Sequence, residues 1–211
     1  MLTRVKTGLD ESRYQRFEGR GLERGAGALL GAALRHALLN RVPGAAVTAV
    51  RAEFDGLKTP PEWIRRLQSS LSLVALTLSS RAGSPLFLRL DVPPSTIVTA
   101  AELERPGVTV VDPSYEICAT RKHRLTLELW LEQGFGMRFG GHARPLPEGA
   151  VAVDAFFGPV IRADYYVHHN DGDHLERVVL EVETNGVLTP QAALWKAALH
   201  AAPEWDVEIA D

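Results

Sequence analysis

The sequence predicts an α+β fold: a discontinuous domain of two helices on an antiparallel sheet, with a β-rich domain inserted into it. Three observations predict this arrangement. An apolar helical segment lies near each end of the chain, strand-like segments lie beside both, and the middle of the chain alternates apolar and polar residues with a period of two. With 211 residues and 45% hydrophobic content, the chain can bury a substantial core.

The first helix is expected over residues 29–40, and it is more apolar than a surface helix needs to be. Leucines and alanines leave only a narrow polar stripe at Arg35, His36 and Asn40. A surface helix usually has an apolar stripe of roughly 100° or a little more, so the surplus apolar face needs a partner. The helix is expected to stop at Val42-Pro43-Gly44, because proline lacks the N–H donor and restricts the residue before it.

The middle of the chain is predicted to be mostly strands. Residues 45–53 predict a strand and residues 61–70 a short helix, and period-two alternation then runs from residue 71 to about residue 141. The alternation is clearest in the even spacing of four leucines, Leu125, Leu127, Leu129 and Leu131. Proline and glycine residues from 140 to 147 mark the return to the first domain.

The end of the chain predicts a strand, a turn and a capped helix. Residues 177–184 form the strand, and Asn185-Gly186 supplies the turn. Thr189 is a suitable N-cap, and Pro190 suits the first helical position. We therefore assign residues 1–51 and 150–211 to the discontinuous domain and residues 52–149 to the inserted domain.

Composition narrows the function classes. A formal charge of −3 and a pI near 6.2 argue against a dominant affinity for nucleic acid, so any role near DNA is expected to be indirect. Cys118 is the single cysteine, the first residues contain no apolar signal region, and no run approaches the roughly 18 apolar residues of a membrane span. We expect a cytoplasmic protein with no membrane contact.

Two patterns suggest other chemistry. The glycines from Gly25 to Gly31 resemble a dinucleotide-binding fingerprint, but that motif follows a buried strand, and residues 17–24 are polar. Close approach of the backbone to a neighbouring segment explains these glycines better. Potential metal ligands gather in one short segment, at His168, His169, Asp171, Asp173 and His174. We interpret that segment as a solvated hairpin loop. The alternative is that it holds the metal ion of a metal-dependent enzyme.

Nothing in the sequence assembles an active site. Cys118 has no identified activating base, so a buried or inert thiol is expected. We expect no catalytic residues, no cofactor and no metal.

With both helices placed, the sequence resembles the N-terminal domain of the bacterial RNA polymerase alpha subunit. The matching stretches occur in the same order over nearly the whole chain: Tyr14-Gln-Arg-Phe17, Leu22-Glu-Arg-Gly25, Leu30-Gly-Ala-Ala-Leu-Arg35, Pro43-Gly-Ala-Ala-Val-Thr-Ala-Val50, Val111-Asp-Pro113, Ile117-Cys-Ala-Thr120, Val153-Asp-Ala-Phe-Phe-Gly-Pro-Val160 and Glu181-Val-Glu-Thr-Asn-Gly186. The resemblance rests on all of these stretches together, because no single one of them identifies the family.

The resemblance implies a non-catalytic, dimerising scaffold on which the beta and beta-prime subunits assemble. In that family the helices that correspond to residues 29–40 and 191–201 pack across a two-fold axis, which agrees with the apolar surplus described above. Six residues are therefore expected in the homodimer interface or in the core beside it: Leu30, Leu34, Leu38, Leu194, Trp195 and Leu199. For each of them, the alternative is an ordinary core position within one chain.

The resemblance also implies contacts with the large subunits. An arginine pair of the family is matched here by Arg35 and His36, which are expected to contact beta, and Arg162 lies in the segment expected to approach beta-prime. Solvated surface positions are the alternative for both arginines.

The sequence departs from the family at several places, and two of these departures, at His36 and at the end of the sequence, leave a second function open. Histidine replaces arginine at His36, residues 52–61 are shortened, and the sequence stops at Asp211, where the family continues to a C-terminal DNA-binding domain. The alternative function is a stand-alone regulatory protein that forms mixed dimers with alpha or sequesters beta.

Overall fold

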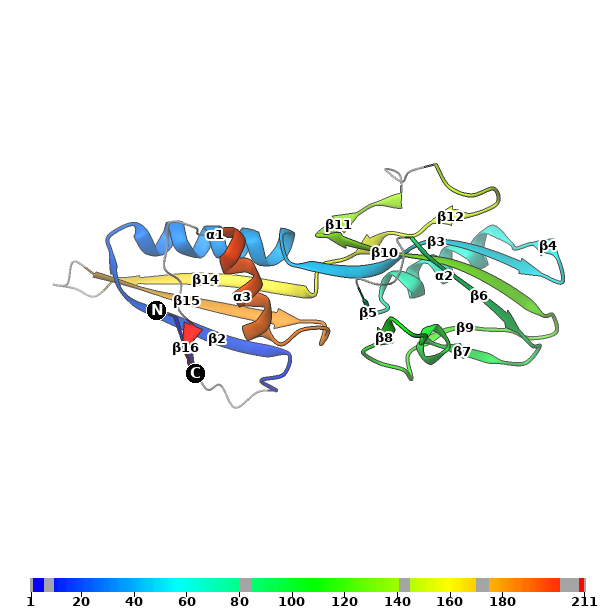
Figure 1. Ribbon diagram of the computed structural model, residues 1–211, viewed down its shortest axis with the longest axis horizontal. Helices are drawn as coiled ribbons and strands as arrows, with labels where there is room; N and C mark the ends of the chain where they lie inside the picture. Colours follow the sequence, from blue (N-terminus) through cyan, green and yellow to red (C-terminus); the bar gives the residue numbers. More distant parts are fainter. Residues whose placement is uncertain are drawn as a thin grey trace. The chain divides into compact units, whose positions relative to one another are not determined.

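The computed structural model describes residues 2–5, 10–79, 85–140, 145–169, 175–201 and 209–210. The chain divides into two compact units: Met1–Val42 with Gly158–Asp211, and Pro43–Phe157. Figure 1 shows helices and sheets in both units, and the sheets are almost entirely antiparallel, which confirms the α+β fold class.

Both junctions between the units differ from the expected boundaries after residues 51 and 149. Strand β3 (Pro43–Phe54) forms a ladder with β10 (Leu125–Phe135) along its whole length. Strand β12 (Val151–Ala152) also pairs with β3. Because backbone hydrogen bonds hold these strands in one sheet, the whole of β3 and the segment up to Phe157 belong to the second unit.

The first unit is one sheet covered on one face by two helices. The sheet has the order β14-β15-β2-β1-β16, and only the β1–β16 pair is parallel. Its strands are β1 (Leu2–Val5), β2 (Tyr14–Glu23), β14 (Val160–His169), β15 (Leu175–Thr184) and β16 (Ile209–Ala210). Helices α1 (Ala26–Asn40) and α3 (Pro190–Ala201) lie on the same face of this sheet in Figure 1 and pack against each other.

Strand β2 corrects one sequence expectation. The polar residues 17–24 predict no buried strand before the glycine-rich segment, yet β2 pairs with β15 along its length and with β1 at residues 16–19. Only Gln15, Phe17 and Gly19 of this strand are buried. Because the strand buries one large hydrophobic side chain, its own sequence carries little strand signal, and neighbours distant in sequence supply the pairing.

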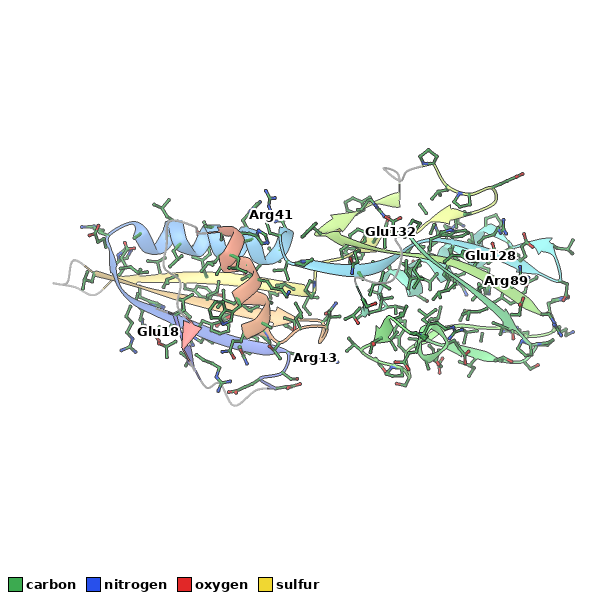
Figure 2. All side chains as sticks on the ribbon, viewed as in Figure 1. Arg13, Glu18, Arg41, Arg89, Glu128 and Glu132 are labelled. Atoms are coloured by element: carbon green, nitrogen blue, oxygen red, sulfur yellow. The ribbon has the colours of Figure 1, made fainter. Side chains whose placement is uncertain are left out.

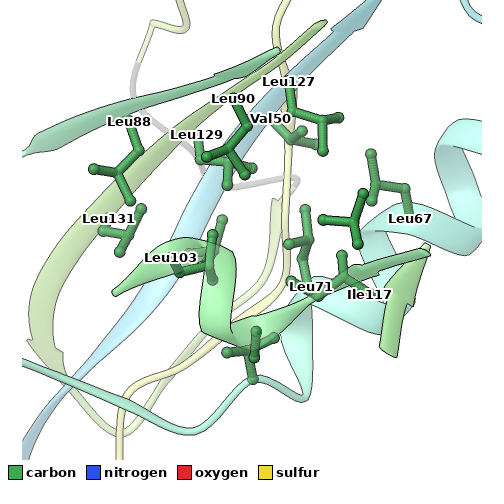
Figure 3. Close-up of a cluster of buried hydrophobic side chains, with 14 of the residues drawn as sticks. Val50, Leu67, Leu71, Leu88, Leu90, Leu103, Ile117, Leu127, Leu129 and Leu131 are labelled. Carbon is green, nitrogen blue, oxygen red and sulfur yellow. The ribbon is translucent and has the colours of Figure 1, made fainter. Parts of the chain in front are cut away.

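The second unit surrounds its own core. Its main sheet has the order β6-β10-β3-β5-β8, from β6 (Leu86–Val92), β5 (Leu76–Leu78) and β8 (Val108–Val110) beside the two long strands already named. The smaller elements are β4 (Leu57–Lys58), α2 (Pro61–Ser72), β7 (Ile97–Thr99), the short 3-10 helix η1 (Ala100–Leu103), β9 (Glu116–Ala119), β11 (Met137–Arg138) and β13 (Ala155–Phe156). Figure 3 shows Leu127 and Leu129 of β10 on one side of this core and Leu67 and Leu71 of α2 on the other, with Leu131 beside Leu88 and Leu103. The alternation of β10 is therefore confirmed as a half-buried strand.

Candidate functional site

Helix α1 begins at a buried carboxylate. Gly25, which has a φ of 90°, is the residue before the first turn, and its N–H donates to Glu176 Oε1 at 2.7 Å. The N–H of Gly27 donates to Glu176 Oε2 at 2.9 Å. Since the first N–H groups of a helix have no partner within it and attract negative charge, the carboxylate satisfies two of these donors and favours the helix dipole.

The same contact explains why the glycine-rich segment does not fit a dinucleotide. A dinucleotide site needs the helix N-terminus free to receive a pyrophosphate. Here Glu176 already accepts both N–H groups at that place. The segment follows a strand, as the fingerprint requires, but its anion position is filled by the protein itself.

The glycines of α1 serve close packing, as the sequence predicted. A Cβ placed on Gly31 would lie 2.3 Å from a ring atom of Tyr165, and one on Gly27 would lie 2.8 Å from Glu176 Oε2. Both distances are shorter than any ordinary contact. The absence of side chains at these two positions lets α1 lie directly on strands β14 and β15.

Helix α3 begins as the sequence predicted. Thr189 Oγ1 accepts the N–H of Ala192 at 3.2 Å, so Thr189 is the N-cap, and Pro190 occupies the first helical position. In the preceding turn, Asn185 Oδ1 accepts the N–H of Val187 at 3.1 Å, and Gly186 has a φ of 91°. The turn and the cap together direct α3 back over the sheet.

The six residues expected at or beside the dimer interface separate into two groups. Four of them are buried in the core that the two helices share with the sheet: Leu30, Leu34, Leu38 and Leu194. The other two, Trp195 and Leu199, are one helical turn apart on α3 and are 49% and 73% exposed. A side chain already buried within one chain has little surface left for a partner chain. Only Trp195 and Leu199 can therefore contact a second chain.

Leu29 belongs with the exposed pair and was not singled out from the sequence. It is 68% exposed on α1, next to Ala28 and Ala32, which are also exposed. A helical wheel could have found it, because five residues at 100° each separate Leu29 from the buried Leu34 by about 140°. We call Leu29, Trp195 and Leu199 the outer helical face; it is the side of the two helices that points away from the sheet.

The three residues expected to contact the large subunits do not form one patch. Arg35 and His36 are exposed on α1, and Arg35 Nε donates to the carbonyl oxygen of Ala163 at 2.9 Å. Arg162 is the neighbour of Ala163 on β14. Because successive side chains of a strand point to opposite faces and Ala163 faces the helices, Arg162 lies on the face without helices.

The helix-free face of the sheet carries a ladder of charged and aromatic side chains. Arg162 Nε lies 3.2 Å from Glu183 Oε2 on β15, and its guanidinium carbon lies 5.9 Å from the ring centre of Tyr14 on β2. Burial, followed by the nearby Glu181 carboxylate, raises the pKa of Tyr14. Further along β2, Figure 2 labels Glu18, whose pKa is lowered chiefly by its hydrogen bond from Arg20. The position of Arg162 is thus fixed by an acidic and an aromatic side chain of neighbouring strands.

The segment with potential metal ligands extends beyond the described residues. His168 and His169 are exposed on β14, and His169 Nδ1 lies 3.4 Å from Glu176 Oε1, whereas Asp171, Asp173 and His174 lie outside the described residues. Among the residues that the structure describes, no three His, Cys, Asp or Glu side chains are grouped to hold a metal ion.

The cysteine is partly buried on β9. Burial raises the pKa of the Cys118 thiol to about 11, so the thiol is protonated at neutral pH and is a poor nucleophile. As for the helices, none in the described part of the chain is both long and apolar enough to span a membrane.

Comparisons with known proteins agree with this geometry. A family model described as the RNA polymerase Rpb3/Rpb11 dimerisation domain matches residues 21–200. A protein named DNA-directed RNA polymerase subunit alpha from Synechococcus elongatus is 35% identical over 205 residues, which cover 92% of this chain and 66% of the relative. Proteins of the same name from Roseiflexus sp. and Herpetosiphon aurantiacus are 31% and 33% identical, over 88% of this chain and 60% and 59% of their own lengths. The chain therefore spans between 59% and 66% of the length of these relatives.

Proposed function

The chain belongs to the RNA polymerase Rpb3/Rpb11 dimerisation domain family, and from this premise we propose that it is an alpha-like, non-catalytic assembly subunit of DNA-directed RNA polymerase. It pairs with a second copy through the outer helical face and binds the beta and beta-prime subunits through other surfaces of the same unit. The observation that carries the proposal is the exposure of Leu29, Trp195 and Leu199 on helices whose opposite sides are fully packed.

Dimerisation follows from the apolar character of this face. Two large leucines and a tryptophan exposed on one helical layer are costly in water, and burying them against a partner recovers roughly 25 cal/mol per Å² of apolar surface. A two-fold pairing buries the same residues on both copies, which suits a face formed by two helices of one chain. Tryptophan is also among the residues that most often dominate an interface.

The contacts with the large subunits are proposed at two separate places. Arg35 and His36 offer donors on the helical side of the unit, and Arg162 offers a held guanidinium on the helix-free side. Opposite faces of one sheet allow two different partners to bind without competing. Arginine is suited to both, because its planar group can meet a carboxylate or a backbone oxygen with two hydrogen bonds.

The test is to purify the tagged chain from the cells that encode it and to identify the proteins that accompany it. The proposal expects both beta and beta-prime, with no other alpha chain in the complex. Recovery of full-length alpha alone, or of beta without beta-prime, supports the regulatory alternative instead. Recovery of no polymerase subunit contradicts the proposal.

Two substitutions sharpen this test. Arg35→Ala should reduce recovery of beta and leave the dimer intact, and Arg162→Ala should reduce recovery of beta-prime. Arg13→Ala is the matched control, because Arg13 is an exposed arginine of the same unit that the proposal does not use. Equal recovery of both large subunits with all three variants would remove Arg35 and Arg162 from the binding surfaces.

A further inference from the structure

Four consecutive basic residues form an exposed loop in the second unit. Arg121, Lys122, His123 and Arg124 connect β9 to β10, and all four side chains are exposed. We call residues 121–124 the basic loop. The chain as a whole has a net charge of −3, so this local excess of positive charge is not a consequence of composition. Among the described residues, no ion pair engages the side chains of Arg121 or Lys122.

Hydrogen bonds on both sides hold the backbone of the basic loop. Asp55, in the turn after β3, accepts the N–H of Arg124 at 3.1 Å and pairs with His123 Nδ1 at 2.6 Å. On the other side, the N–H and the hydroxyl of Ser95 donate to the carbonyl oxygen of Arg121 at 2.8 and 3.0 Å. The charged side chains are therefore presented by a fixed backbone, which lowers the entropy lost when a partner binds.

The buried hydroxyl of Thr120 strengthens this support. Thr120 Oγ1 donates to the carbonyl oxygen of Pro93 at 2.7 Å and accepts the N–H of Thr96 at 2.9 Å. These two hydrogen bonds join Thr120, the last residue before the basic loop, to the turn that follows β6. Because a threonine buried to this degree needs its hydrogen bonds satisfied, the arrangement of the two turns is well determined.

Exposed apolar side chains flank the basic loop on both sides. Leu57 lies in the β3–β4 hairpin and pairs with Phe54 of β3. Phe54 in turn pairs with Leu125, the first residue after the basic loop, so the hairpin lies beside the loop. Ile97 lies on β7 and pairs with Ala119 at the end of β9. Leu57 and Ile97 are both more than half exposed, so each of the two segments beside the basic loop carries an exposed apolar side chain.

We infer that the basic loop and its two apolar flanks bind an acidic protein segment that carries apolar residues between its carboxylates. Charge complementarity selects carboxylates for the loop, and the flanking Leu57 and Ile97 select apolar side chains. A nucleic acid fits less well. Lysine and arginine side chains neutralise phosphates, and this loop has only three of them, because its fourth basic residue, His123, already pairs with Asp55. A phosphate backbone would also leave the apolar flanks uncovered.

The experiment measures the binding of three fluorescein-labelled probes to the whole chain by fluorescence anisotropy. The probes are a peptide of alternating Glu and Leu, a poly-Glu peptide of the same length and single-stranded poly-dT. We expect the Glu/Leu peptide to bind most tightly. The double variant Arg121→Glu with Lys122→Glu should weaken that binding by roughly tenfold or more, because like charges then face each other.

Two further variants complete the design. Arg13→Glu with Arg41→Glu makes the same change in net charge on two exposed arginines of the other unit, labelled in Figure 2, and should leave binding unchanged. Leu57→Ser with Ile97→Ser should reduce the affinity for the Glu/Leu peptide to that for poly-Glu. The inference is overturned by undetectable binding of the Glu/Leu peptide, by equal binding to the loop variant and the control, or by tighter binding of poly-dT than of the Glu/Leu peptide.

Discussion

At the scale of single residues, Glu176 connects parts of the chain that are far apart in sequence. Its carboxylate accepts the N–H groups of Gly25 and Gly27, about 150 residues earlier, and so fixes the start of α1 against β15. These hydrogen bonds, with the Gly25 bond as the largest effect, lower the pKa of Glu176. The sequence does not reveal this contact, because a glutamate at a strand end has no pattern that points to a distant helix.

The lowered pKa predicts how this contact depends on pH. A carboxyl group whose pKa is depressed in the folded state stabilises the fold above its unfolded pKa of about 4.3 and loses that contribution as the pH falls through the lower folded value. Glu176→Gln should therefore lower the melting temperature at neutral pH, and the difference from wild type should shrink in acid. Thermal unfolding followed by circular dichroism over this pH range measures it. A difference that does not change with pH would contradict the proposed role.

Gly31 makes a second prediction at this scale. Alanine is favoured over glycine within helices by about 1 kcal/mol, so Gly31→Ala would stabilise α1 if there were space for the methyl group. The ring of Tyr165 occupies that space, and we expect a net loss of about 1–3 kcal/mol from overpacking. Urea unfolding measures the loss. In a Tyr165→Leu background the same substitution should cost less, and an equal cost in both backgrounds would exclude the ring as the cause.

At the scale of elements, the sequence specified the helices better than the direction in which their side chains point. The N-cap Thr189, the proline stop after α1 and the alternation of β10 are local signals, and each was sufficient. Leu29 and Leu30 are adjacent leucines of one helix, yet the first is exposed and the second is buried. Composition does not separate such neighbours; their angular positions on the helix do, once the packing of α1 on β14 shows which side faces the core.

Strand β2 is an element that the local sequence does not predict. Eight residues separate it from its partner β1, and its other partner, β15, begins about 150 residues after it. A strand with polar outward residues and glycine at a buried position is stabilised mainly by those partners, so no window of its own sequence predicts it.

The two sides of α1 should respond differently to truncation. Leu34→Ala empties part of a filled core and should lower the free energy of unfolding by about 2–5 kcal/mol at every protein concentration. Leu29→Ala removes only outer apolar surface, so its effect should come from weaker pairing and should disappear as the protein is diluted. Urea unfolding at several protein concentrations separates the two. A concentration-independent loss for Leu29→Ala would place that side chain in the core instead.

At the scale of the whole molecule, the chain presents several distinct surfaces. The first unit has the outer helical face, the exposed donors of Arg35 and His36 and, on the opposite face of its sheet, the ladder around Arg162. The second unit has the basic loop with its apolar flanks. In the proposed function, these separate surfaces bind different proteins, so substitutions in one of them should leave binding through the others unchanged.

The measurement that tests the central claim most directly is sedimentation equilibrium of the wild-type chain and of Trp195→Glu with Leu199→Glu. The account predicts that wild type sediments with twice the mass of the chain and that the variant is a folded monomer, since two carboxylates on each copy would face an apolar partner. Leu57→Glu with Leu73→Glu, at two leucines of the second unit that are 71% and 69% exposed, should remain dimeric. A wild-type monomer, or a variant that still forms the dimer, would contradict the claim that the outer helical face pairs two copies.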